Sequence, residues 1–116
     1  MELTGTAKLL RVFIGEADRL EGKPLHERIV IAARQRGLAG ATVLRGVESF
    51  GASSRLHTAK VLRMSEDLPI VIEIVDDEEK IAEFLPTLDA LLEQGGQGGL
   101  VTLERVEVIR YRPRSD

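Results

Sequence analysis

Arginines and glycines near the C-terminus of this 116-residue chain are the residues best suited to bind an anion. Arg110, Arg112 and Arg114 recur at every second position, so they share one side of a strand if the chain stays extended. A guanidinium binds phosphate through two parallel hydrogen bonds. Upstream, the run Gly95–Gly99 (GGQGG) offers backbone N–H groups that can surround an anion. The alternatives are a solvated chain end for the arginines and a simple helix-closing turn for the glycines.

Other catalytic and binding chemistry has less support in the sequence. His26 and His57 have no partner at metal-ligand spacing, and the chain has no cysteine for a thiolate zinc site. Ser53 and Ser54 lie in GASSR, which lacks the second glycine of a nucleophile elbow. The net charge of −3 and the 3% aromatic content do not match a nucleic-acid-binding surface. We therefore expect a non-enzymatic, cytoplasmic protein without a metal site or a nucleic-acid partner.

The segment 46–67, which begins GVESFGASSRLHTAK, is the third candidate feature. It is roughly 20 residues long and separates two predicted strands, whereas a hairpin connection usually has about 2–5 residues. Long connections on a small domain are often functional. This segment is therefore a candidate surface for a partner protein. Its candidate contact residues are Phe50, Gly51, Ser53, Ser54, Arg55, His57 and Lys60.

Hydrophobic periodicity predicts the elements that position these residues. Alternation predicts strands over 8–14, 41–45, 68–75 and 100–111, and helical spacing predicts helices over 24–36 and from Asp76 to the glycine run. Gly37 is expected to end the first helix. Asp76 and Glu79 have capping-box spacing at the start of the second, and Pro86 predicts a kink or break within it. The apolar face of this helix is expected to contain Ile81, Leu85, Leu88 and Leu92.

The order strand-helix-strand, long segment, strand-helix-strand predicts one ferredoxin-like βαββαβ domain over residues 1–116. This is an α+β fold in which both helices cover one face of an antiparallel sheet. The other sheet face is expected to carry Val71, Val75, Ile109 and Tyr111, which are too apolar for free solvent. We therefore expect that face to pack on another subunit.

Three stretches resemble the bacterial signal-transduction protein PII. GATVLRGVESFGASSRLHTAK is similar to the PII strand that enters its T-loop, and SEDLPIVIEIVDDEEKIAEFLPTL to the strand and helix that follow. GGQGGLVTLERVEVIRYR is similar to the B-loop and the last strand. With LRVFIGEADRLEGKPLHE included, nearly the whole chain more closely resembles a PII-like family known as domain of unknown function one-ninety.

The PII resemblance implies a homotrimeric regulatory protein that binds an adenine nucleotide, AMP, ADP or ATP, in clefts between subunits. It also implies that the segment 46–67 contacts a partner such as a membrane transporter, a channel or an enzyme. The ligand-binding positions that it implies are Thr42, Gly96, Gly98, Gly99, Arg110 and Arg112.

The chain departs from PII in three respects, one of which is that the PII glutamine near the start of the T-loop corresponds to Ser53 or its neighbour. Where the PII B-loop ends in a lysine, this chain has Gly99, so a smaller or less charged ligand than ATP is an equal candidate. Its only tyrosine is Tyr111, outside the T-loop, so we do not expect uridylylation. Two alternatives stay open: a small phosphate-ester hydrolase that uses His57 or a nearby carboxylate in the same cleft, and a metal-tolerance type of trimer.

Overall fold

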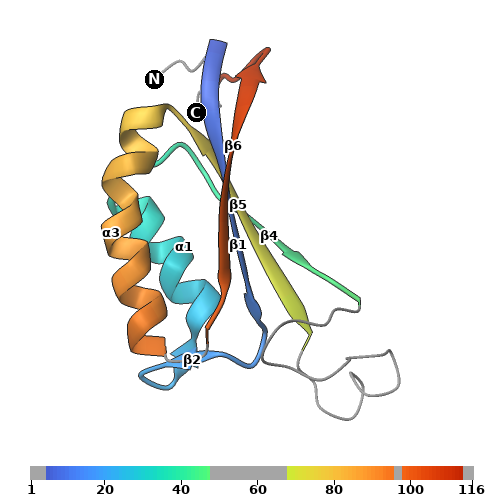
Figure 1. The fold of residues 1–116 in the computed structure, drawn as a ribbon, viewed down its shortest axis with the longest axis vertical. Helices are drawn as coiled ribbons and strands as arrows, with labels where there is room; N and C mark the ends of the chain where they lie inside the picture. Colours follow the sequence, from blue (N-terminus) through green and yellow to red (C-terminus); the bar gives the residue numbers. More distant parts are fainter. Residues whose placement is uncertain (1–4, 48–67, 96–97, 114–116) are drawn as a thin grey trace.

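The computed structural model describes residues 5–47, 68–95 and 98–113. Four strands form an antiparallel sheet in the order β4-β5-β1-β6, β2 and β3 form a short separate ribbon, and α1 and α3 lie together on one face of the sheet (Figure 1). This arrangement confirms the predicted ferredoxin-like α+β fold. The elements in chain order are β1 (Gly5–Gly15), β2 (Arg19–Leu20), β3 (Lys23–Pro24), α1 (Leu25–Gln35), β4 (Thr42–Arg45), β5 (Pro69–Asp76), α3 (Glu78–Gly95) and β6 (Leu100–Val108).

The hydrophobic core lies between the helices and the two central strands. Successive side chains of a strand point to opposite faces, so every second residue of β1 and β5 faces α1 and α3. Phe84 of α3 is fully buried there, whereas Leu85 and Leu92, which were expected on the core face, are only half-buried. The core residues from these four elements are Leu10, Val12, Ile14, Leu25, Ile29, Ala33, Ile70, Ile72, Ile74, Ile81, Phe84 and Leu88.

One end of each helix, the end of α1 and the start of α3, was predicted from the sequence and can be compared with the structure. Gly37 adopts a φ of +77°, and the N–H of the next residue, Leu38, donates to the Ala33 carbonyl at 3.1 Å. This geometry confirms Gly37 as the residue that ends α1. At the start of α3, Asp77 provides the cap, because its Oδ1 accepts the Lys80 N–H at 2.8 Å. The prediction that Asp76 caps α3 is wrong, since Asp76 is the last residue of β5 and its carboxylate is engaged elsewhere.

Pro86 does not break α3, which continues from Glu78 to Gly95. A proline removes one backbone donor from the helix. Here the proline ring is exposed, while Phe84 and Leu88 on either side of it are buried in the core. Burial of large apolar side chains contributes about 1.5–3 kcal/mol each and offsets the lost hydrogen bond.

Of the helices in the described part of the chain, none has both the length and the hydrophobicity needed to cross a bilayer.

Strand β6 ends earlier than its sequence pattern predicts. Val108 pairs with Gly5 of β1 and is the last residue of β6. The sequence predicted that this strand continues to Tyr111. Arg110 and Arg112 instead lie past the end of β6. Ile109, which is 82% exposed, and Tyr111, which is half-buried, lie in the same tail. The prediction that these two residues form part of the open sheet face is therefore wrong.

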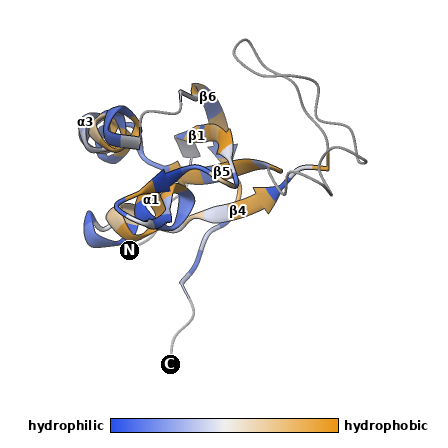
Figure 2. Cartoon of the chain, turned by 90° about the horizontal axis from the view of Figure 1, so that it is seen from below, coloured by the Kyte–Doolittle hydropathy of each residue, from blue (hydrophilic) through white to orange (hydrophobic). Residues whose placement is uncertain are grey.

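The sheet face opposite the helices is apolar with a charged centre. Apolar residues occur along β4 and β5 in Figure 2, and Val71 and Val75 of β5 are half-buried on this open face. Near the middle, Arg11 forms ion pairs with Glu73 at 2.9 Å and with Glu104 at 3.0 Å, and so links β5, β1 and β6. The hydrogen bond that Arg11 donates to the Glu73 carboxylate is the largest cause that raises the pKa of Arg11.

Candidate functional site

The glycines before β6 have two different structural roles. Gly98 has a φ of +80°, and nothing lies within 4 Å of the position that a Cβ would take. Its backbone is therefore open to a ligand. At Gly99 a Cβ would lie 3.2 Å from the Phe13 carbonyl oxygen and 3.3 Å from Cγ2 of Ile14, so close packing against β1 favours glycine. Gly96, which was also predicted to bind the ligand, lies outside the described residues.

The two ends of the segment 46–67 are held at the same end of the sheet as Gly98. The Gly46 N–H donates to the Pro69 carbonyl, and the Glu16 N–H to the Leu68 carbonyl, both at 2.7 Å. Arg45, the last residue of β4, forms an ion pair with the Glu16 carboxylate. The predicted partner-contact residues Phe50, Gly51, Ser53, Ser54, Arg55, His57 and Lys60 lie outside the described residues.

The two predicted ligand arginines lie at the opposite end of the sheet from Gly98. The nine residues of β6 separate the two groups, and this corresponds to roughly 30 Å at the rise of an extended strand. The sequence placed the glycine run before the last predicted strand and the arginines near its end, and in the structure the two groups lie beyond opposite ends of β6. Arg110 and Arg112 are exposed, and neither forms an ion pair with another described residue.

Thr42 is the first residue of β4 and is exposed. It pairs with Glu73 of β5, so its side chain shares the open sheet face with Arg11. It follows Ala39 by three residues, and Ala39 accepts a hydrogen bond from the Tyr111 hydroxyl at 3.2 Å. Thr42 thus lies in the same row as Arg11, near the middle of the sheet, and its near neighbour in the chain, Ala39, contacts the C-terminal tail.

Asp76 holds two backbone segments together, a role that the sequence did not indicate. It is fully buried, and its two carboxylate oxygens accept the N–H groups of Ala39 at 2.8 Å and of Asp77 at 2.7 Å. The Lys80 ammonium donates to the Gly37 carbonyl at 3.1 Å in the same turn. The one sign of this role in the sequence is that Asp76 begins an acidic run, and such a run also predicts a helix cap.

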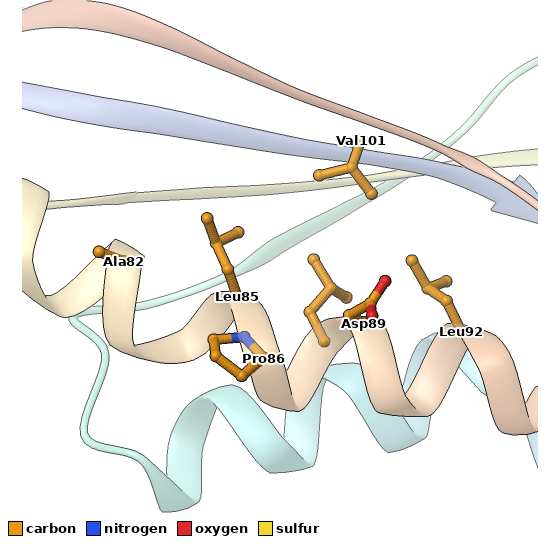
Figure 3. A pocket seen from close by; sticks show the side chains of 7 residues that line it. Ala82, Leu85, Pro86, Asp89, Leu92 and Val101 are labelled. Atoms are coloured by element: carbon orange, nitrogen blue, oxygen red, sulfur yellow. The ribbon is translucent and has the colours of Figure 1, made fainter.

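A groove of about 440 Å³ lies between α3 and β6 (Figure 3). Asp89 is its one charged lining residue, and the others are Ala82, Leu85, Pro86, Leu88, Leu92 and Val101. None of the predicted ligand-binding residues lines this groove. Within the described ranges there is also no group of three His, Asp or Glu side chains that could hold a metal ion.

Comparison with known proteins identifies the family. The family model DUF190, described as Uncharacterized ACR, COG1993, matches residues 7–108. The chain belongs to the DUF190 family. A UPF0166 protein of Aquifex aeolicus is 42% identical over 102 residues, which cover 88% of this chain and 92% of that protein. A UPF0166 protein of Methanocaldococcus jannaschii is 33% identical over 90 residues, with 78% and 82% of the two chains covered.

Solved structures show that this DUF190 chain shares the fold of PII-like proteins. CPII from Thiomonas intermedia K12, a nitrogen regulatory PII-like protein solved with ADP, AMP and bicarbonate, has a TM-score of 0.68. It is 19% identical and covers 90% of each chain. The apo form of CPII gives a TM-score of 0.59 at 18% identity, over 93% of this chain and 97% of that one. These likenesses confirm the PII-like fold that the sequence predicted.

Proposed function

We propose that this DUF190 protein is a PII-like regulator that forms a homotrimer and binds an adenine nucleotide between adjacent subunits. The observation that carries the proposal is the separation of two anion-binding groups by the full length of β6. An exposed glycine lies at one end, and at the other lie two guanidiniums that form no ion pair within the described part of the chain. A nucleotide cannot reach across roughly 30 Å of strand, so a complete site needs Gly98 from one chain and Arg110 and Arg112 from another.

The chemistry of the two groups suits a phosphorylated ligand. Guanidiniums bind phosphate oxygens bidentately, and backbone N–H groups of a glycine turn add further donors. The structural neighbour CPII was solved with ADP and AMP, which supports an adenine nucleotide for this chain. Gly99 brings no ammonium group to the turn, and we therefore favour AMP or ADP over ATP.

A trimer would cover the open sheet face. On this face Leu44 is 47% exposed and Leu100 is 56% exposed, although both are large and apolar. Burial contributes about 25 cal/mol for each Å² of apolar surface removed from water, so this face favours contact with a second copy. The segment 46–67 would then remain at the edge of the assembly, where it could contact a transporter, channel or enzyme. Nucleotide binding would act by favouring one conformation of the protein and involves no chemical step.

Assembly is the first testable consequence. Sedimentation equilibrium of the wild type is expected to give three times the chain mass of 12.8 kDa. Leu44→Glu should shift the mass toward that of a single chain, because three carboxylates would be placed in an apolar interface. The matched control is Ile31→Glu on α1, since Ile31 is similarly exposed at 49% but lies on the helical layer. A monomeric wild type, or equal masses for both variants, would contradict the trimer.

Nucleotide binding is tested by calorimetric titration of the wild type with AMP, ADP and ATP. We expect the Arg110→Ala/Arg112→Ala variant to bind at least about 100-fold more weakly, because hydrogen bonds to charged groups contribute roughly 1.5–3 kcal/mol each. Arg36→Ala is the control, since Arg36 is an exposed arginine at the end of α1. Absence of binding by the wild type, or unchanged binding by the double variant, would refute the nucleotide site.

A further inference from the structure

Tyr111 ties the C-terminal tail to the rest of the protein. After Val108 the chain leaves β6. The Tyr111 hydroxyl then donates to the Ala39 carbonyl at 3.2 Å. Between described residues, this is the one hydrogen bond that residues 110–113 make to the rest of the protein. The position of the tail therefore depends on this single side chain.

The acceptor of this bond is itself rigidly held. The Ala39 N–H donates to Oδ2 of Asp76 at 2.8 Å, and Asp76 is completely buried at the end of β5. The other oxygen of Asp76 accepts the Asp77 N–H at the start of α3. Tyr111 is thus connected, through the backbone of one residue, Ala39, and one buried carboxylate, to the junction of the sheet and the helical layer.

Arg110 and Arg112 flank this anchor. Tyr111 is half-buried, whereas both arginines are exposed. Each arginine is a direct neighbour of Tyr111 in the chain, so fixing Tyr111 restricts the positions of two exposed guanidiniums at once.

We propose that Tyr111 is a positioning residue for anion binding: its bond to Ala39 orients Arg110 and Arg112 toward one ligand before the ligand arrives. The inference rests on the proposed nucleotide site and assigns to it a residue that does not touch the ligand. Preorganisation increases affinity because less conformational freedom is lost on binding. Without the hydroxyl, part of the binding free energy is used to order the tail, and the affinity is lower.

The test is Tyr111→Phe, which removes the hydroxyl and keeps the ring. ADP affinity measured by calorimetry should fall about three- to tenfold, the effect expected for one neutral hydrogen bond. The sedimentation mass should not change. Thr87→Val, which removes a half-buried hydroxyl of α3, is the control and should bind ADP as the wild type does.

A second background separates positioning from general damage to the structure. In Arg112→Ala, where one of the oriented arginines is gone, Tyr111→Phe should cost less affinity than it does in the wild type, because the two changes are coupled. Wild-type affinity in Tyr111→Phe, or an undiminished loss in the Arg112→Ala background, would overturn the inference. Unchanged ADP binding in Arg110→Ala/Arg112→Ala would instead refute the nucleotide site itself.

Discussion

Mixing two variants that are each unable to bind ADP is expected to restore binding. Arg110→Ala/Arg112→Ala removes the guanidiniums and keeps Gly98, while Gly98→Asp keeps the guanidiniums and disrupts the glycine turn. If each site takes its glycine turn from one chain and its arginines from the next, a mixed trimer contains one site with both groups intact. Equal amounts of the two variants, combined at random, should recover roughly a quarter of the wild-type sites.

The Gly98→Asp variant is chosen so that the chain still folds. Nothing lies within 4 Å of a Cβ at this position, and aspartate tolerates the left-handed conformation better than most residues. Its carboxylate would repel a phosphate at the turn. Gly99 is less suitable for this purpose, because a side chain there would press on the backbone of β1.

The measurement is calorimetric titration with ADP after the two variants are unfolded together and refolded, with native mass spectrometry to confirm mixed trimers. The control is each variant unfolded and refolded by itself, which should still not bind ADP. Mixed trimers without recovered binding would show that one chain supplies the whole site, which contradicts the division of the site between the two ends of β6.

The largest expected loss of stability is for Asp76→Ala. This change leaves the N–H groups of Ala39 and Asp77 without their acceptor at a fully buried position. An unsatisfied buried donor costs about 1–3 kcal/mol, so we expect the free energy of unfolding to fall by roughly 2–4 kcal/mol.

Urea unfolding at one fixed protein concentration measures this difference, because the stability of an oligomer depends on concentration. Asp89→Ala is the matched control on α3, where the carboxylate is exposed, and it should change the free energy of unfolding by less than about 0.5 kcal/mol. Equal unfolding midpoints for the two variants would show that the buried carboxylate is not needed to hold the turn at Ala39.

Most of the fold could be predicted from local patterns. The alternation in PIVIEIVD gave β5 to within one residue at each end, since alternate side chains meet the core and the open face in turn. Gly37 was predicted to end α1 because a left-handed residue is needed there, and the structure confirms it. These features depend on residues close in sequence, and the order of elements then restricts the topology to few choices.

Predictions failed where the outcome depended on a distant partner. The pattern of β6 continues to Tyr111, but the strand ends at Val108, and the Tyr111 hydroxyl donates to the distant Ala39 carbonyl. Spacing favoured Asp76 as the cap of α3 because Glu79 follows it by three residues, but the Asp76 carboxylate is buried against Ala39 and Asp77 provides the cap. Arg11 pairs with Glu73 and Glu104, 62 and 93 residues away, and spacing cannot reveal that register.

The sequence by itself determined the family, the strand and helix order, and the residue types capable of holding an anion. Resemblance of its motifs indicated the family, whereas the strand and helix order follows from side-chain periodicity and turn chemistry, which act over a few neighbouring residues. Only the tertiary structure decided that Asp76 is buried where it accepts the Ala39 N–H and that Tyr111 anchors the tail at Ala39. The physical reason is that folding brings residues from distant parts of the chain together, and spacing in the sequence does not show which of them meet.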